Sequence, residues 1–527
     1  MTPVSRLFLV SMLLTLAGLA QAGPPTFDIT VEVEGTGDVT FDPQGPYKKN
    51  NMVTVTASPG EGYVFDHWEG DLAGDVNPTI LRISGDHVIL ASFSADSGGG
   101  DPGGGDPGGG DPGGGGNVSG IHPGPLPESG MLVGYFTSWS VYRRAYYPGE
   151  IESSGAAEKL HVINYAFAGI DENYRCSILD SFADYGKAFD ADETVDHIAD
   201  SQSQPLKGNF NQLRKLKEMY PDLRVLISVG GWSESSRFSD MASAPVSREA
   251  FISSCIDMFI RGNVADGVSA AGVFDGIDID WEYPGRCGAT CDFREEDPDN
   301  FALLLQEFRA ALEQEESDVA DVVGIRPEYL LTIAAPAGEY YYEVFPVAAI
   351  HGALDWINIM AYDFHGTWES SGPANHHAPL YRSECDDEAT ADFGDKAIQA
   401  YRSAGVPGSK LLLGVPFYGH GWRGVAALND GLCNTARGIP RGTYEKGVDD
   451  YEVLAASGDP IFHEDDDWAA WTFDGSEFWS FDDPVSLGTK AGYTLDQGLR
   501  GIMFWELSGD DPTASLVRAL RDGLDAP

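Results

Sequence analysis

The stretch FDGIDIDWEYP, residues 274–284, decides the fold and points to the functional site. Alternate residues of a β-strand point to the same face, so Asp278, Asp280 and Glu282 share one face of this strand. Burial and mutual repulsion both disfavour ionisation of three neighbouring carboxyl groups, so we expect at least one pKa to rise. The local sequence offers no cation to neutralise these acids, which favours a functional role over a structural one.

The same strand is one of eight short apolar runs that follow residue 130, and amphipathic segments lie between them. Continuous apolar strands that alternate with helices indicate a parallel sheet covered on its face. Eight such units in about 400 residues predict an α/β protein with a (β/α)8 TIM barrel rather than an open sheet. The predicted strands are Met131–Phe136, Leu160–Phe167, Leu223–Val229, Gly272–Trp281, Tyr329–Ala335, Leu354–Tyr362, Lys410–Phe417 and Gly501–Glu506. The predicted helices include Phe210–Met219, Arg248–Ile260, Asn300–Leu312 and Asp392–Ser403.

The position of Glu282 along its strand suggests its role. The chemistry of a TIM barrel lies at the carboxyl ends of the strands, whereas the opposite ends serve stability. Glu282 is the last of the three aligned acids and therefore lies closest to the carboxyl end. We predict that it is the proton donor of the site.

Several motifs of this sequence resemble glycoside hydrolase family 18, the chitinases. Asp275, Asp278, Asp280 and Glu282 match the pattern Asp-x-x-Asp-x-Asp-x-Glu of that family. The segments SVGGW at 228–232, MAYDFHG at 360–366 and GVPFYG at 414–419, followed by Trp505, match further motifs in order along the predicted strands. The resemblance covers residues 131–527 and implies a retaining hydrolase of β-1,4-linked N-acetylglucosamine polymers that needs no cofactor.

The resemblance also implies a role for each matching residue. Glu282 would protonate the glycosidic oxygen, and the 2-acetamido oxygen of the substrate would attack the anomeric carbon in place of a protein nucleophile. Asp280 would orient the acetamido group, and Asp278 would share a proton with Asp280. The remaining catalytic or substrate contacts are expected from Tyr362, Tyr418, Asp363 and Trp505.

A second group of residues completes the expected substrate-binding set. These residues are Asp275, Tyr135, Phe136, Trp232, Met360 and Trp368. For Tyr135 and Phe136, packing in the core is an equal alternative. His420 stands where the family often has Arg, which puts one expected contact in doubt.

The histidines do not predict a metal site. His365, His376 and His377 lie close together in the sequence, but no carboxylate accompanies them at a spacing typical of metal ligands.

The long connection between the last two predicted strands indicates an extra unit. Residues 419–500 exceed what a simple barrel connection needs. Within it, residues 423–473 resemble the small α+β insertion of many family 18 chitinases. Such an insertion would form one wall of a deep groove in the catalytic domain, which we place at residues 129–527.

Two segments at the start of the chain resemble targeting and linker sequences. Residues 1–22 combine Arg6, a mostly apolar run and the small residues Ala20-Gln21-Ala22, as in a cleaved signal peptide. The apolar run is too short for a comfortable membrane anchor. Residues 97–128 are rich in Gly with three Asp-Pro pairs and predict a linker, with calcium binding as the weaker alternative.

Between these segments, residues 23–96 predict a small β-rich domain, because alternating runs are separated by Gly, Pro and Asn. The stretch GYVFDHWEGD at 62–71, which follows VTVTA at 53–57, resembles the divergent bacterial repeat related to the internalin B-repeats. Tyr63, Phe65 and Trp68 either stack on sugar rings or form the core; a domain this small has few large residues to spare, which favours the core.

The six cysteines are even in number, and export to an oxidising compartment permits disulfides. Cys287 and Cys291 are close enough to pair, whereas the other partners stay open and some cysteines are equally explained as buried thiols. The formal charge of −49 argues against a nucleic-acid partner. The acidic residues are dispersed along the chain and lysines are few. This pattern indicates adaptation to salt rather than a surface charge that serves only solubility.

These patterns lead to one main functional hypothesis and two alternatives. The main hypothesis is a secreted, monomeric chitinase acting on chitin and chitooligosaccharides, with no membrane, metal or cofactor. An endo-β-N-acetylglucosaminidase acting on glycoproteins would share the same acids, but the insertion and the Tyr362-Asp363 pair favour a chitinase. A non-catalytic chitin-binding lectin would typically lack the terminal acid, and here Glu282 is present.

Overall fold

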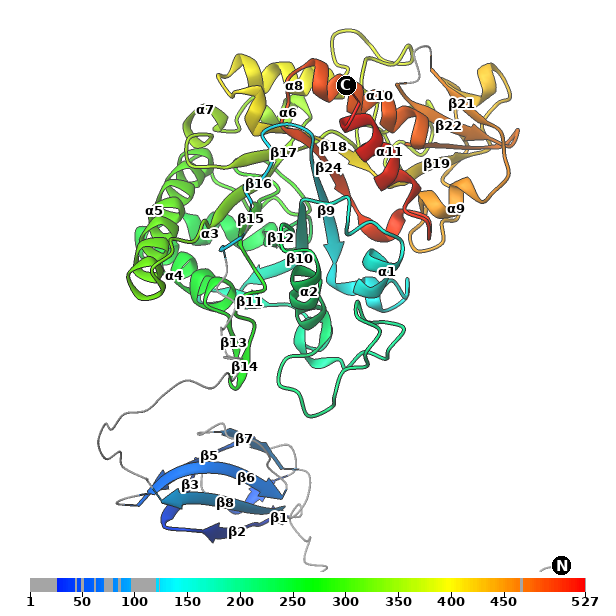
Figure 1. The fold of residues 1–527 in the computed structure, drawn as a ribbon. Helices are drawn as coiled ribbons and strands as arrows, with labels where there is room; N and C mark the ends of the chain where they lie inside the picture. The colour runs from blue at the N-terminus through cyan, green and yellow to red at the C-terminus, as the bar shows by residue number, and fades with distance from the viewer. Residues whose placement is uncertain are drawn as a thin grey trace, which may run out of the picture. The chain divides into compact units, whose positions relative to one another are not determined.

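The computed structural model describes residues 26–42, 45–48, 52–60, 63–70, 79–83, 87–95, 120–122, 124–464 and 468–526. The chain forms two compact units, Met1–Asp111 and Pro112–Pro527 (Figure 1). The predicted signal peptide and residues 97–119 of the predicted linker lie outside the described residues.

The larger unit contains the predicted barrel. Its parallel strands follow one another in sequence order, and β9 pairs with both β10 and β24, which closes the sheet on itself. The expected (β/α)8 fold is therefore confirmed. The barrel strands are β9 (Met131–Thr137), β10 (Val162–Ile170), β12 (Arg224–Gly230), β15 (Gly276–Asp280), β16 (Leu330–Pro336), β17 (Trp356–Met360), β18 (Leu411–Pro416) and β24 (Gly501–Trp505).

Helices surround this barrel (Figure 1). Their ends follow ordinary capping rules: Pro298 lies in the first turn of α5, and Gly324 ends that helix with a positive φ of 80°. The helices are α1 (Pro148–Ser153), α2 (Gly208–Met219), α3 (Phe238–Ala242), α4 (Pro245–Cys255), α5 (Asp297–Val323), α6 (Glu339–Tyr342), α7 (Val347–Ile350), α8 (Gly394–Ser403), α10 (Pro484–Asp496) and α11 (Ser515–Leu524).

The strand periodicity divides the core into two layers. On β9, Met131, Val133 and Tyr135 belong to the cluster inside the barrel, whereas Leu132 and Phe136 belong to the cluster between barrel and helices. The same alternation operates on β15, where Ile277 and Ile279 join the outer cluster. Because alternate residues face opposite sides, Asp278 and Asp280 must point into the barrel.

An antiparallel sheet interrupts the barrel between β18 and β24, where the sequence predicts an α+β insertion. Its strand order is β20-β19-β23-β22-β21. This sheet extends beyond the predicted insertion at 423–473 on both sides. Strand β19 begins before that segment, and strand β23 follows it. The elements are β19 (Tyr418–Arg423), β20 (Val448–Asp450), α9 (Tyr451–Ala455), β21 (Ile461–His463), β22 (Ala470–Phe473) and β23 (Glu477–Phe481).

The smaller unit is β-rich, as predicted. Its sheets have the strand orders β2-β8-β6 and β3-β5-β7, with a short β1-β4 pair. Phe65 packs edge-on against Phe93 at 5.7 Å, and Tyr63 packs against the same buried cluster, which favours the core over a sugar platform for both. The side chain of Trp68 lies outside the described residues. The strands are β1 (Thr26–Phe27), β2 (Ile29–Glu34), β3 (Gly37–Asp42), β4 (Tyr47–Lys48), β5 (Met52–Pro59), β6 (Tyr63–Gly70), β7 (Thr79–Arg82) and β8 (His87–Ala95).

All six cysteines are paired. Cys287 bonds to Cys291, as the spacing predicts, and the two pairs that the sequence left open are Cys176–Cys255 and Cys385–Cys433. The last of these joins the loop after β17 to the insertion. None of the described helices has the length and apolar composition that a membrane-spanning segment requires.

Candidate active site

The centre of the barrel holds Asp278 in a dense hydrogen-bond network. Its carboxylate accepts hydrogen bonds from four side chains on four different barrel strands. The donors are Tyr135 Oη at 2.7 Å, Ser228 Oγ at 2.7 Å, Thr332 Oγ1 at 2.6 Å and Asn358 Nδ2 at 3.3 Å. Burial raises the pKa of Asp278, and these donors act against that shift.

Asp280 and Glu282 continue the row toward the carboxyl end of β15. Burial, followed by the charges of Glu282 and Asp278, raises the pKa of Asp280 well above its ordinary value. Burial also raises the pKa of Glu282 to about 7; a hydrogen bond from Tyr283 opposes this rise, and the charge of Asp363 adds to it. A carboxyl group with such a pKa holds its proton near neutral pH and is suited to general acid catalysis.

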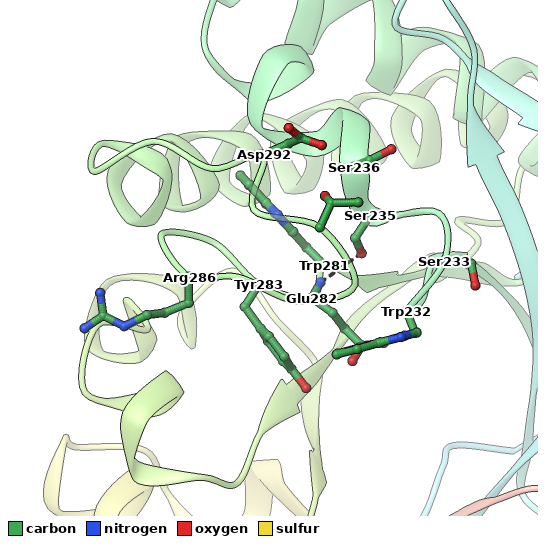
Figure 2. Close-up of a pocket in the computed structure, with 10 residues that line it drawn as sticks. Trp232, Ser233, Ser235, Ser236, Trp281, Glu282, Tyr283, Arg286 and Asp292 are labelled. Carbon is green, nitrogen blue, oxygen red and sulfur yellow. Dashed lines mark hydrogen bonds between the residues drawn. The ribbon is translucent and has the colours of Figure 1, made fainter. Parts of the chain in front are cut away.

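The loop after β12 positions Glu282. Gly230 and Gly231 have positive φ angles of 114° and 84°, and a Cβ on Gly230 would lie 2.2 Å from the carbonyl oxygen of Asp280. The close approach lets Gly231 N–H donate to that oxygen at 2.8 Å. Ser235 Oγ then accepts a hydrogen bond from the backbone N–H of Glu282 at 2.9 Å (Figure 2).

Aromatic side chains surround the acids. Trp505, at the end of β24, stacks on Phe167 with ring centres 5.6 Å apart and contacts Tyr135 at 5.2 Å. Trp232 and Trp368 are 52% and 59% exposed, and Trp232 lines a small pocket together with Glu282 and Tyr283 (Figure 2). Exposed and half-buried indole faces at strand ends suit the apolar faces of pyranose rings.

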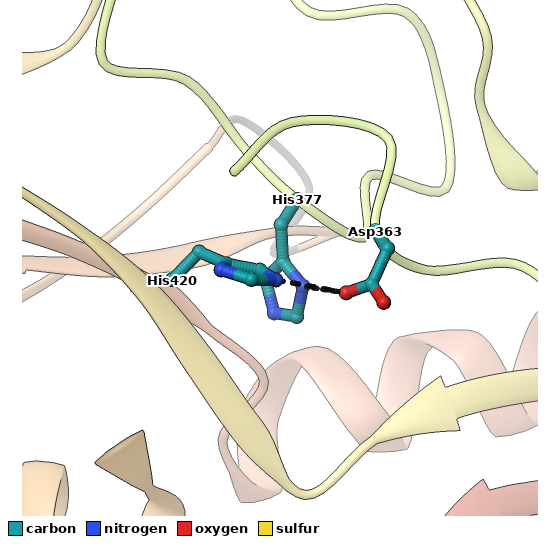
Figure 3. Close-up of side chains that lie close together, drawn as sticks. All are labelled: Asp363, His377 and His420. Atoms are coloured by element: carbon teal, nitrogen blue, oxygen red, sulfur yellow. Dashed lines mark hydrogen bonds and ion pairs between the residues drawn. The ribbon is translucent and has the colours of Figure 1, made fainter. Parts of the chain in front are cut away.

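The polar wall beside the acids is formed by residues of β19 and of the loop between β17 and α8. Tyr418 Oη donates to Asp363 Oδ1 at 2.6 Å. His420 Nε2 lies 2.9 Å from the same oxygen, as Figure 3 shows. Burial raises the pKa of Asp363, but His377 and His420 outweigh it and hold the pKa below its ordinary value. The Tyr362 and Tyr418 rings meet edge-on at 6.3 Å.

Asp275 lies away from this group, so the expected substrate contact is wrong for it. It precedes β15 at the opposite end of the barrel and is fully buried. Lys217 Nζ, His122 Nε2 and the backbone N–H of Val225 all lie within 2.9 Å of its carboxylate. The pKa of Asp275 is therefore held below its ordinary value, and the residue stabilises the barrel floor.

Phe136 is also excluded from the groove. Because it alternates with Tyr135 on β9, it points outward, where it packs on Tyr146 and Tyr165 and is fully buried. Phe136 therefore packs in the core, which was the alternative to substrate binding. Tyr135, by contrast, is buried inside the barrel and contacts both Asp278 and Trp505, and Met360 packs against the inner cluster.

Sequence reasoning missed several polar residues of the site. Thr332 and Asn358 interrupt predicted apolar strands at inward-facing positions, and this interruption is the signal that identifies them. Ser235 gave no comparable signal, and His377 was considered only as a metal ligand and rejected, because the loops that carry them reach the site only through the tertiary fold. The cluster of Asp363, His377 and His420 likewise joins residues that no sequence spacing connects.

Comparison with known proteins settles the family. The model of "Glycosyl hydrolases family 18" matches residues 131–510. The chain belongs to glycosyl hydrolase family 18. The "Divergent InlB B-repeat domain" model matches residues 27–97, in agreement with the β-rich character of the smaller unit.

Individual relatives of this family 18 protein are called chitinases. Chitinase 63 of Streptomyces plicatus is 38% identical over 77% of this chain, and this chain spans only 62% of that relative. The catalytic domain of psychrophilic chitinase B from Arthrobacter TAD20 has a TM-score of 0.70 and 34% identity, with 76% of this chain and 97% of that chain covered. A group IV chitinase of Ostrinia furnacalis, solved in complex with allosamidin, has a TM-score of 0.61 and 29% identity, with 75% and 98% covered.

Proposed function

We propose that this family 18 protein is a chitinase that hydrolyses β-1,4-linked N-acetylglucosamine polymers with retention of configuration. The observation that carries the proposal is the row Asp278, Asp280 and Glu282 at the carboxyl end of β15, in which burial raises the pKa of Glu282 to about 7. Its similarity to named chitinases supports the same reading of the substrate.

The proposed reaction proceeds in two steps. Glu282 gives its proton to the glycosidic oxygen as the bond from that oxygen to the anomeric carbon breaks, and the acetamido oxygen of the substrate forms a new bond to that carbon. Water then attacks the anomeric carbon, the acetamido oxygen leaves, and Glu282 takes the proton from the water. No protein nucleophile takes part.

Asp280 is the group that supports the acetamido function. Its Oδ1 atom is buried and has no hydrogen-bond partner among the described residues, so it can accept the N–H of the substrate. Asp278, held by four donors, shares a proton with Asp280 and thereby limits the repulsion between two neighbouring acids. Tyr362, Tyr418 and Asp363 contact the sugar from the insertion side, and Trp505 lies beneath it.

Two alternatives remain testable against this proposal. A chitin-binding lectin would bind chitooligosaccharides without cleaving them, and an endo-β-N-acetylglucosaminidase would release glycans from glycoproteins. Incubation of the protein with chitohexaose, crystalline chitin and a high-mannose glycoprotein separates the three, because only a chitinase produces short chitooligosaccharides from the first two. Binding without products from any of them would overturn the enzyme assignment.

The cellular setting is part of the proposal. Residues 1–22 act as a signal peptide, which delivers a monomeric enzyme to extracellular chitin, and the excess of 82 acidic over 33 basic residues adapts it to salt. We place a β-rich domain at 23–96 and a catalytic domain at 129–527; of the linker proposed at 97–128, the described end is bound to the barrel, where His122 Nε2 lies 2.9 Å from Asp275.

A further inference from the structure

We propose that Asp363, His377 and His420 form a binding site for one divalent transition-metal ion of the Zn²⁺ type. The sequence predicts no such site, because the three residues are separated by 14 and 43 positions and gather only in the folded chain. Asp363 and His377 come from the loop between β17 and α8, and His420 comes from strand β19 of the insertion.

The ligand atoms are already close to one another. His420 Nε2 lies 2.9 Å and His377 Nδ1 lies 3.7 Å from Asp363 Oδ1, and one ligand atom from each of the three residues lies within 4.8 Å of the others. Both imidazole rings are directed at this one oxygen (Figure 3). Tetrahedral zinc with bonds of about 2.1 Å holds its ligand atoms about 3.4 Å apart, so small side-chain rotations complete the site.

Buried imidazole nitrogens in this cluster lack close hydrogen-bond partners among the described residues. His377 is fully buried; its Nε2 has no hydrogen-bond partner in the described part of the chain, and its Nδ1 has only Asp363 Oδ1 at the longer distance of 3.7 Å. His420 is 5% exposed, and its Nδ1 atom is likewise unpartnered among these residues. Buried polar atoms are nearly always hydrogen-bonded in folded proteins. A metal ion bound to His377 Nδ1 would give this nitrogen a bonding partner.

The backbone holds both histidines in place. The N–H of His377 donates to Ser480 Oγ at 3.0 Å, and its carbonyl accepts from the N–H of Phe364 at 2.9 Å. His420 pairs with Val448 on one side and Ser480 on the other, in the middle of the insertion sheet. Ligands that are fixed before the ion arrives lose little entropy on binding, which favours affinity.

The donor set selects the class of ion. Two imidazoles and one carboxylate suit Zn²⁺ or Cu²⁺, whereas Ca²⁺ and Mg²⁺ require sites built from oxygen ligands. We therefore expect Zn²⁺ to bind and Ca²⁺ to leave the site empty.

Binding at this place would reversibly inhibit hydrolysis, and this consequence rests on the proposed function. Asp363 Oδ1 accepts the hydrogen bond of Tyr418 at 2.6 Å, and a metal ion would compete for that oxygen. Both residues contact the substrate in the proposed mechanism, so the ion would disorganise the sugar-binding wall without touching Glu282.

Isothermal titration calorimetry with ZnCl₂ tests the site without any activity measurement. The full chain is first treated with EDTA and dialysed, and then compared with His420→Arg, His377→Gln and the control His351→Ala, whose histidine follows α7 and lies outside the cluster. We expect one Zn²⁺ to bind the wild type and the control equally, and both cluster variants to bind at least tenfold more weakly. CaCl₂ should give no heat of binding.

The outcomes separate the metal site from the proposed function. Equal Zn²⁺ affinity of the wild type and both folded cluster variants would overturn the site, as would binding of Ca²⁺ with the affinity of Zn²⁺. If neither variant folds, the absorption spectrum of Co²⁺ bound to the wild type decides, because oxygen-only octahedral coordination contradicts the proposal. Failure to cleave chitohexaose in EDTA would instead refute the chitinase assignment and leave the calorimetric result valid.

Discussion

Asp278 and Asp280 lie two positions apart on β15, yet Asp278 accepts four hydrogen bonds, whereas the Oδ1 atom of Asp280 accepts none from the described residues. The difference arises because Asp278 lies at the level where polar side chains of four strands converge, and Asp280 lies one layer closer to the open end. The inner acid is therefore fixed by the protein, and the outer acid is available to a substrate.

Replacement of Glu282 by Gln should abolish turnover while binding persists. The amide has no proton to give, and loss of a general acid typically costs about 10² to 10⁴ in rate. Chitohexaose hydrolysis followed by product chromatography, with oligosaccharide affinity measured in parallel, checks this expectation. Glu313→Gln, which changes an exposed acid on α5, is the matched control, and undiminished turnover by Glu282→Gln would rule out its role.

The pH dependence of the rate should show that Glu282 acts as a general acid. Because burial raises its pKa to about 7, the protonated form predominates below pH 7 and is lost above it. We expect kcat/KM for a chitooligosaccharide to fall on the alkaline side with a midpoint near pH 7. A profile that stays flat to pH 9 would contradict this assignment.

The raised pKa of Glu282 also makes the stability of the folded protein depend on pH. The folded protein binds the Glu282 proton more tightly than the unfolded chain, whose pKa is near the ordinary 4.5, so stability falls as pH rises from about 4.5 to about 7. Glu282→Gln removes this cost and should stabilise the fold at pH 8 by on the order of 3 kcal/mol. Urea unfolding at pH 4 and pH 8 checks it, and the two proteins should differ little at pH 4.

The acetamido group of the substrate should be indispensable. In the proposed mechanism its oxygen replaces a protein nucleophile, and Asp280 supports it. Chitosan oligosaccharides without acetyl groups, and cello-oligosaccharides, should therefore resist cleavage under conditions that hydrolyse chitohexaose. Rapid hydrolysis of cellohexaose would overturn the substrate-assisted account while leaving a glycosidase in place.

Asp275→Asn should reduce stability and spare catalysis. It leaves Lys217, which is 10% exposed, without its buried carboxylate partner. Removing one partner of a buried ion pair typically costs about 3–5 kcal/mol. Denaturant unfolding should show this loss, and kcat of the folded protein should match the wild type. A selective fall in kcat at unchanged stability would restore the substrate-binding role that the motif suggested.

Molar salt should leave the enzyme active. Salt screens the repulsion among surface acids, so a chain with a formal charge of −49 gains stability from it. Hydrolysis of chitohexaose and thermal unfolding in 0.1 M and 2 M NaCl check this expectation. Loss of structure or activity in 2 M NaCl would refute the adaptation to salt.

The sequence located the barrel strands and the row of acids because both depend on local periodicity. Ile277 and Ile279 face outward and Asp278 and Asp280 face inward for the same reason, the alternation of a strand. That alternation could not assign Phe136, since either face of a barrel strand is apolar. The expectation for Asp275 was wrong because it rested on the family motif alone, whereas the position of Asp275 before the aligned acids puts it toward the amino end of the strand.

The sequence by itself determined the barrel, the identity and order of its acids, and Glu282 as the outermost of them, because these follow from short-range spacing along one strand. The tertiary structure decided which neighbours each acid has. Thr332 and Asn358 reach Asp278, Ser235 reaches Glu282, and His377 with His420 reaches Asp363 only when strands and loops distant in sequence converge. Hydrogen bonding and desolvation depend on those neighbours. The raised pKa of Glu282 and the lack of hydrogen-bond partners at the histidine nitrogens among the described residues therefore follow from the tertiary structure and could not be predicted from the sequence.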